Sequence, residues 1–330
     1  MGDPQATKRH VPHVSGRYAL YLGCTAPVRA LNYERAARAT AARLGIELID
    51  VNDFGCCGFP LKAVQHDAAL LLSARNLALA EEQGLDICAL CSSCTGTLAE
   101  ANHALQSDEA LRQRTNQALE AATGHRYKGT IQVRHFVRVL YEQVGLDRIR
   151  QAVTVDLSGL RLAAHYGCHY LKPVDAHDRF DDPENPRSLD RLITALGAES
   201  IYYEGRDQCC GGGILGADEN TALAMPHLKL ERVVAAGADA LVIVCPFCDI
   251  MYELQQRRIE KLYETRYNVP VVFYPQLLGL AMGLSAEEVG LPLNRVKSKK
   301  LMVLATWPAD ASQGGQGAGM EIAGDGRAQG

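Results

Sequence analysis

Short apolar runs alternate along the chain with longer stretches in which apolar side chains recur every three or four positions. The short runs have the length of buried β-strands, and the longer stretches are typical of amphipathic helices that cover a sheet. Strands that alternate with helices in this way form α/β units with a mainly parallel sheet. The pattern predicts helices over residues 33–44, 67–83, 219–236 and 249–263.

This order of runs occurs twice in the sequence. In each copy an apolar run ends in Gly-Cys, a Cys-Cys-Gly follows, a second apolar run leads into Cys-x-x-Cys, and a third runs directly into a helix. The repetition predicts two tandem units of the same α/β fold, related by a pseudo-twofold axis. The matched segments are 17–24 with 161–168, 84–94 with 237–248, and 130–140 with 269–278.

The duplication divides the chain into two domains and a tail. We expect the first domain over residues 15–147 and the second over residues 158–296, with a linker near residues 146–160. Residues 303–330 are rich in Gly, Ala and Asp, which predicts a disordered C-terminal tail. In open α/β sheets, ligands bind at the loops that follow the strands. Because the paired cysteines occupy those loops, we expect the functional site there.

Composition and charge narrow the class of protein. The 330 residues are 47% hydrophobic, which is enough for two full cores. The formal net charge of −4, with basic and acidic residues spread along the sequence, argues against nucleic acid and against insertion into a membrane. The first fourteen residues contain no apolar core of a signal peptide, so we expect a cytoplasmic protein.

Ten of the eleven cysteines follow one spacing in both halves. After a first Cys, 31 or 40 residues precede a Cys-Cys doublet, and a further 33 or 34 residues precede Cys-x-x-Cys. Neighbouring cysteines do not readily form a disulfide with each other, because their Cα atoms lie only about 3.8 Å apart. Such sets of soft thiolates are typical of metal sites. The ten are Cys24, Cys56, Cys57, Cys91, Cys94, Cys168, Cys209, Cys210, Cys245 and Cys248.

The remaining cysteine, Cys88, aligns in the repeat with Val242, an apolar strand position, which favours a buried core residue over a ligand. Zinc and iron–sulfur clusters are both candidates for the metal. A zinc ion takes four ligands, whereas each half offers five thiols, which favours a cluster with several irons. The Gly-x-Gly-x-x-Gly at residues 211–216 lacks the strand and the acidic residue that a dinucleotide site requires.

Three motifs of the second half carry a family resemblance. They are His-Tyr-Gly-Cys-His-Tyr-Leu-Lys-Pro at 165–173, Gln-Cys-Cys-Gly-Gly-Gly at 208–213 and Cys-Pro-Phe-Cys at 245–248. The duplicated pattern resembles the cysteine-rich CCG domain, and residues 17–284 resemble the B subunit of heterodisulfide reductase. The resemblance implies an oxidoreductase that acts on sulfur groups as part of a complex, reducing a disulfide or running the reverse oxidation of thiols or sulfane sulfur.

The resemblance also implies the cofactors, since each CCG domain of that family holds a noncubane 4Fe–4S cluster with five cysteines. Carried over residue by residue, the first cluster takes Cys24, Cys56, Cys57, Cys91 and Cys94. The second cluster takes Cys168, Cys209, Cys210, Cys245 and Cys248.

The ferredoxin run of four cysteines that ends in Cys-Pro is absent from the sequence. This absence implies that a separate ferredoxin-like C subunit supplies the electrons, and the resemblance adds a flavin-containing A subunit. An alternative is an electron-relay subunit of a flavin-dependent hydroxy-acid dehydrogenase of the glycolate or lactate type. A zinc-stabilised assembly protein is a third hypothesis.

Breaking a disulfide takes two electrons, whereas an iron–sulfur cluster ordinarily delivers one, so we expect a disulfide to bind between the two sites. His169 and Lys172 closely follow Cys168 and are the candidate catalytic residues. Lys62 follows the first doublet and is a candidate for binding an anionic substrate. The other two histidines near the motifs, His165 and His135, are expected to be buried core residues.

Overall fold

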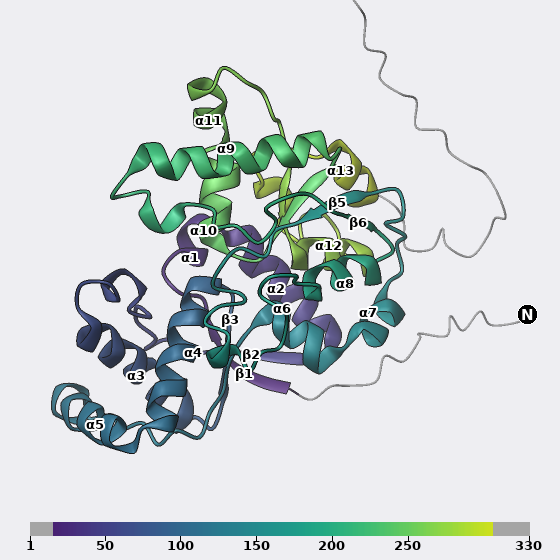
Figure 1. Ribbon diagram of the computed structural model, residues 1–330. Coiled ribbons are helices and arrows are strands. Elements are labelled where there is room, and N and C mark those ends of the chain that lie inside the picture. Colours follow the sequence, from purple (N-terminus) through teal and green to yellow (C-terminus); the bar gives the residue numbers. More distant parts are fainter. Residues whose placement is uncertain (1–15, 306–330) are drawn as a thin grey trace, which may run out of the picture.

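The computed structural model describes residues 16–305, which form two parallel four-stranded sheets flanked by helices. The first sheet has the strand order β2-β1-β3-β4, and the second has the equivalent order β6-β5-β7-β8 (Figure 1). The predicted α/β fold with two related units is therefore confirmed. Residues 1–14, which are expected to carry no signal peptide, lie outside the described range.

The first half alternates strands and helices as the hydrophobic pattern predicts. Its strands are β1 (Gly16–Tyr21), β2 (Ile46–Asp50), β3 (Asp86–Ala89) and β4 (Val133–His135). Its helices are α1 (Ala26–Arg29), α2 (Leu31–Leu44), α3 (His66–Glu82), α4 (Ser92–Ser107), α5 (Glu109–Thr123), α6 (Phe136–Val139) and α7 (Leu146–Ala152), with a 3₁₀ turn at Phe59–Leu61 and a π-helical turn at Leu140–Val144.

The second half repeats this arrangement. Its strands are β5 (Arg161–Ala164), β6 (Glu199–Ile201), β7 (Ala240–Ile243) and β8 (Val271–Phe273). Its helices are α8 (Ser188–Ala195), α9 (Glu219–Ala235), α10 (Pro246–Asp249), α11 (Gln256–Leu262), α12 (Tyr274–Ala281) and α13 (Lys299–Ala305). Shorter turns are the 3₁₀ segments Asp175–His177, Gly212–Ile214 and Leu291–Leu293 and the π-helical turn Ile250–Leu254.

The central strands are buried on both faces, which explains their apolar sequences. Every residue of β7 is buried, and β5 pairs with it in parallel through Leu162 with Ala240 and Ala164 with Val242. Parallel strands end at the same edge of a sheet, so the loops that follow them meet there. Those loops carry the cysteine motifs.

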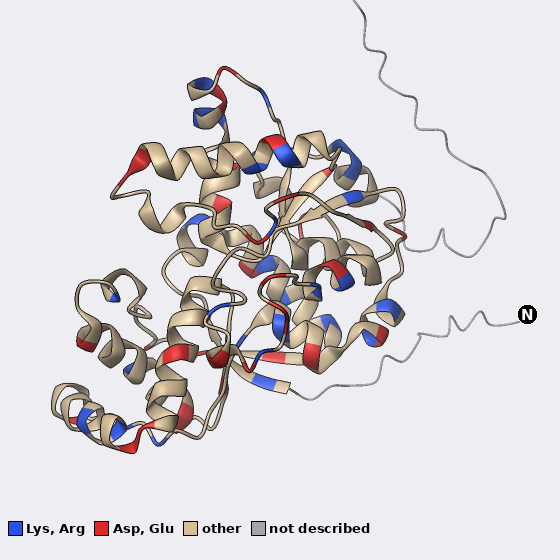
Figure 2. Cartoon of the chain, in the orientation of Figure 1, with Lys and Arg blue, Asp and Glu red and all other residues tan. Residues whose placement is uncertain are grey.

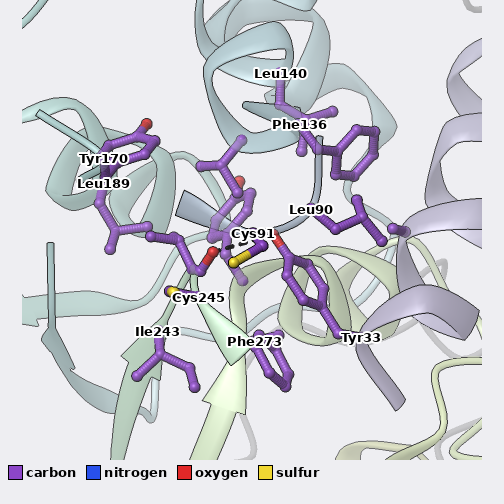
Figure 3. Packing of buried hydrophobic residues seen from close by; sticks show 14 of the residues in the cluster. Tyr33, Leu90, Cys91, Phe136, Leu140, Tyr170, Leu189, Ile243, Cys245 and Phe273 are labelled. Atoms are coloured by element: carbon purple, nitrogen blue, oxygen red, sulfur yellow. Dashed lines mark hydrogen bonds between the residues drawn. The ribbon is translucent and has the colours of Figure 1, made fainter. Parts of the chain in front are cut away.

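The two halves share one hydrophobic core. Helix α2 of the first half packs against α12 of the second, and the ring of Tyr33 stacks on that of Phe273 with centroids 4.1 Å apart. A buried amide contact joins Asn32 to Asn294 at 3.1 Å. Figure 3 shows Tyr33 and Phe273 together among the residues of this core. Neither half therefore covers its own sheet completely.

Three segments differ from the sequence-based expectations. The predicted helix over residues 249–263 is interrupted by the π-helical turn between α10 and α11. The predicted linker over 146–160 contains α7, and the backbone N–H groups of Thr154 and Val155 both donate to the carbonyl oxygen of Ala281, which ties this segment to the second half. Helix α13 reaches Ala305 in the predicted disordered tail 303–330, whose remainder lies outside the described residues.

Acidic and basic side chains are interspersed over the molecule (Figure 2). Within residues 16–305, no helix combines the length and the apolar character that crossing a membrane requires.

Candidate metal centres

The five cysteines of the second half meet at one cavity. Cys168 follows β5, the doublet follows β6, and Cys245 precedes α10, whose first turn contains Cys248. All five line one cavity. The structure therefore brings together every thiol that the sequence assigns to the second site.

The sulfur atoms of this site form a connected set. Hydrogen-bond contacts link Cys168 to Cys209, Cys209 to Cys210, Cys210 to Cys248 and Cys248 to Cys245. The contacts from Cys168 and Cys210 lower the pKa of Cys209, and contact with Cys248 is the main cause of the lowered pKa of Cys245. The same contacts raise the pKa of the partner thiols Cys168, Cys210 and Cys248, so the thiols share protons along the set. Thiolates are the form that binds metal, so this donor set suits a metal centre.

Backbone amides add to the stabilisation of these thiolates. The N–H of Gly211 donates to Cys209 Sγ, and the N–H of Gly212 donates to Cys210 Sγ, both at 3.4 Å. The first half repeats the motif, because the N–H of Gly58 donates to Cys56 Sγ at the same distance. Hydrogen bonds to the charged form of a group favour that form.

The first-half site is less closed. Cys56, Cys57, Cys94 and Cys91 are linked by side-chain contacts, and the contact with Cys94 lowers the pKa of Cys57 to about 7. Cys24 is exposed, and its sulfur lies 3.7 Å from the hydroxyl of Thr25. Four of the five predicted thiols thus gather closely, while Cys24 stays at the edge.

A glycine after each doublet allows the chain to turn against a helix. Gly58 and Gly211 have φ of 93° and 82°. A Cβ on Gly58 would lie 2.6 Å from the carbonyl oxygen of Ala69 in α3, and a Cβ on Gly211 would lie 2.6 Å from that of Ala222 in α9. Both the backbone conformation and the close approach require glycine.

The two sites touch each other. The thiol of Cys91 contacts that of Cys245, and Figure 3 shows the two side chains next to each other. The contact raises the pKa of Cys91 and lowers that of Cys245. The carbonyl oxygen of Val244 accepts hydrogen bonds from three first-half side chains: Tyr33 Oη at 3.3 Å, Ser92 Oγ at 3.5 Å and His135 Nε2 at 2.9 Å. These bonds fix the halves together directly beside the cysteines.

First-half residues also line the second-half cavity. Phe59, Ser92 and Ser93 contribute to its wall. The Phe59 ring meets the imidazole of His169 edge-on at 5.1 Å and lies 6.1 Å from the ring of Phe247. Both repeats therefore line the cavity, and Phe59 and Phe247 form an aromatic part of its wall.

The structure separates the candidate residues outside the cysteine set. His169 lines the cavity, and burial lowers its pKa. Lys172 is exposed and is not part of the cavity wall. Lys62 forms an ion pair with Glu100 and is likewise outside that wall. His135 is buried and holds the interface, as expected of a structural histidine.

Cys88 is fully buried in β3, where it pairs with Leu20 of β1 and Arg134 of β4. Burial raises the pKa of its thiol, which disfavours the thiolate. Among residues 16–305, no three His, Cys, Asp or Glu side chains form a group that could hold one metal ion. The second-half thiols border the cavity described above.

A buried lysine and histidine form a pair beside this site that the sequence pattern did not single out. Lys229 of α9 is 2% exposed, and its ammonium donates to His165 Nδ1 at 2.9 Å. The other ring nitrogen of His165 lies 3.2 Å from Cys248 Sγ. Alignment of the repeats could have pointed to Lys229, because Lys229 and Asn76 both lie nineteen positions after the second cysteine of their doublets.

Comparison with known proteins agrees with this picture. The family model for the CCG cysteine-rich domain matches twice, at residues 18–99 and 162–253. The chain is 35% identical to the B subunit of the ferredoxin/F420H2-dependent CoB-CoM heterodisulfide reductase of Methanosarcina acetivorans, over 86% of this chain and 94% of that protein. It is 32% identical to the 8-methylmenaquinol:fumarate reductase membrane anchor subunit of Wolinella succinogenes, over 86% of this chain and 98% of that protein.

A crystal structure of a hypothetical protein from Helicobacter pylori has a similar fold, with a TM-score of 0.71 and 17% identity. The match covers 87% of this chain but only 53% of that one, so the chain spans about half of the larger protein. The two family matches contain all ten paired cysteines. The chain therefore belongs to the CCG cysteine-rich family and, within it, to the family of heterodisulfide reductase B subunits.

Proposed function

We propose that this chain is the iron–sulfur catalytic subunit of a heterodisulfide reductase-like complex. The observation that carries the proposal is the contact between Cys91 and Cys245, which joins two sets of thiols across the repeat. Two redox centres that meet at one point suit a reaction that needs two electrons at one substrate. The overall reaction takes a disulfide, two electrons and two protons to two thiols, and it can run in reverse to oxidise thiols or sulfane sulfur.

We assign the cofactors as two noncubane 4Fe–4S clusters, each of which would supply one-electron redox chemistry and an iron that binds sulfur. The connected cysteines and the amide donors to sulfur support this assignment. The first-half ligands are Cys24, Cys56, Cys57, Cys91 and Cys94. The second-half ligands are Cys168, Cys209, Cys210, Cys245 and Cys248.

The remaining cavity residues bind and orient the substrate in this proposal. Phe59 and Phe247 offer apolar surface to the carbon atoms on either side of a disulfide. His169 exchanges a proton with the thiol product, because its half-buried imidazole is neutral near pH 7 and lies at the wall. Lys172 has no role here, since it lies outside the cavity wall.

The electrons must come from other proteins. We propose a ferredoxin-like C subunit as the donor and a flavin-containing A subunit further along the path, with no nucleic acid and no direct membrane insertion. The eleven cysteines are all free, which suits a reducing compartment such as the cytoplasm.

Two measurements on the anaerobically purified chain test the proposal. Two clusters predict about eight irons per chain with equimolar sulfide. Electron paramagnetic resonance of the oxidised protein should show a new signal when thiol is added, because a catalytic centre of this kind binds thiol directly. Zinc without iron would refute the cluster assignment.

A full iron content with no spectral response at saturating thiol would instead favour electron relay, as in a flavin-dependent hydroxy-acid dehydrogenase of the glycolate or lactate type.

Phe59→Ala is expected to raise the KM for disulfide about tenfold while the iron content stays unchanged, because the ring contributes apolar contact but no ligand. Steady-state kinetics with the intact complex measure this change. Leu61→Ala, in the same 3₁₀ turn but outside the cavity wall, is the matched control. Equal effects of the two substitutions would remove Phe59 from the substrate site.

A further inference from the structure

Lys229 is an unusual lysine because it is buried next to a proposed metal centre. It lies in α9, is 2% exposed, and donates hydrogen bonds to the carbonyl oxygen of Gln208 at 2.8 Å and to His165 Nδ1 at 2.9 Å. Burial lowers its pKa to about 8, and the nearby cysteines Cys248 and Cys210 act in the opposite direction. Burying an ammonium group without hydrogen-bond partners costs much free energy. The two hydrogen bonds offset part of this cost and keep the charged group beside the site.

His165 connects this charge to the cysteines. Its ring is fully buried and meets Tyr252 edge-on at 4.8 Å. Because Nδ1 accepts from the ammonium, Nε2 carries the proton of the neutral ring and donates toward Cys248 Sγ at 3.2 Å. A continuous line of donors therefore runs from Lys229 through His165 to a ligand sulfur.

The first half has neutral residues at the same two positions. Tyr21 stands three residues before Cys24, as His165 does before Cys168, and its hydroxyl donates to the carbonyl oxygen of Gly55 at 2.6 Å. Asn76 occupies the position of Lys229, accepts from the N–H of Gly55 at 2.9 Å and donates to the carbonyl oxygen of Cys56 at 3.0 Å. The backbone of the doublet loop is therefore held in both halves, but only the second half has a buried cation at this position. The cation beside the first loop, Arg75, is only partly buried and donates to the carbonyl oxygen of Asp53 at 2.7 Å.

The charge near Lys229 is only partly balanced. Asp207 is the carboxylate that acts on it, and this residue is half-buried, so solvent screens its field more than that of the buried ammonium. Adding an electron to a cluster adds negative charge, which a nearby cation and a hydrogen bond to sulfur both stabilise.

We propose that Lys229, acting through His165, is a positioning residue that makes the second-half metal centre easier to reduce than the first-half centre. This inference rests on the proposed function, because it requires a redox cluster at each site. Lys229 touches neither substrate nor metal in this role. It places a positive charge close to the second-half ligands, so the first electron to arrive resides on the second-half centre.

A redox titration of the anaerobic full-length chain, followed by electron paramagnetic resonance, tests the inference. In Lys229→Asn, which copies the first half, the midpoint potential of the second centre should fall while that of the first stays unchanged. Lys229→Arg retains the charge and should keep a potential closer to the original value. Lys261→Asn removes an exposed lysine of α11 and should change neither potential.

Unchanged potentials in a Lys229→Asn variant that still binds its full iron would overturn the inference and leave the proposed function intact. Absence of iron from the unmodified chain would overturn both. A fall in Lys229→Arg as large as that in Lys229→Asn would also count against a role of charge. Cys210→Ser gives an answer that does not depend on Lys229: the surviving first-half centre should account for the lower-potential step. If it accounts for the higher one, the inference is wrong.

Discussion

Replacing Cys210 by serine is expected to remove about half of the bound iron and to abolish disulfide reduction. Cys210 is 6% exposed, lines the second-half cavity and contacts both Cys209 and Cys248. A serine hydroxyl is a poor substitute for a soft thiolate, so the second centre should be lost while the first remains. Iron and sulfide determination on the purified chain, with spectroscopy of the remaining centre, measures the result.

Cys88→Ser is the control for this experiment. Cys88 is equally buried but lies within β3, away from the loops that carry the ligands. Its replacement should lower thermal stability, since a hydroxyl is buried there, and should leave both centres filled. Equal iron loss in the two variants would show that the ligand assignment is wrong.

The second large effect is expected from Gly211→Ala, which should destabilise the chain by about 2–4 kcal/mol and empty the second site. The cost has two sources, because φ at this position is 82° and the new methyl group would lie 2.6 Å from the carbonyl oxygen of Ala222. Relief of the clash requires the doublet to move away from α9, which also displaces Cys209 and Cys210. Thermal unfolding and iron content measure the two consequences.

Gly216→Ala provides a matched control from the same loop. A Cβ at Gly216 meets nothing within 4 Å, so this variant should unfold and bind iron like the unmodified chain. Iron retention in Gly211→Ala comparable to that in Gly216→Ala would mean that the loop tolerates a side chain and that the glycine has no role in shaping the site.

The alternation of apolar runs with helical periods was sufficient to predict the fold class, and the repeated cysteine spacing indicated that the second-half thiols meet. The order of motifs along the sequence is enough for this, because each motif follows a strand and parallel strands end at the same edge of the sheet. Cys88 was also placed correctly by its alignment with Val242, since both occupy buried strand positions.

Two of the edge strands, β2 and β6, could not be recognised from the sequence. Strand β6 has only three residues, and β2 is partly exposed, so neither produces a distinct apolar run. The segment after Cys248 has the pattern of one helix because its side chains keep a helical period throughout. A π-helical turn changes hydrogen bonding without changing that period enough to be visible.

Contacts between residues far apart in the sequence could not be predicted either. In the sequence alone, Phe59 has the features of an ordinary loop residue, and Lys229 has those of the solvated side of an amphipathic helix. Their roles arise only when α9 lies against His165 and when the first doublet loop reaches the second cavity. Such positions depend on tertiary packing, which local periodicity does not encode.

The stacking of Tyr33 on Phe273 has a consequence for the origin of the chain. A duplicated gene first yields two copies that each fold alone, whereas here helix α2 of one copy covers apolar surface of the other. We therefore expect the two repeats to unfold together, because the stack and the Asn32–Asn294 bond are lost when either repeat opens. A change in one cysteine loop that disturbs this shared core is therefore expected to destabilise both halves.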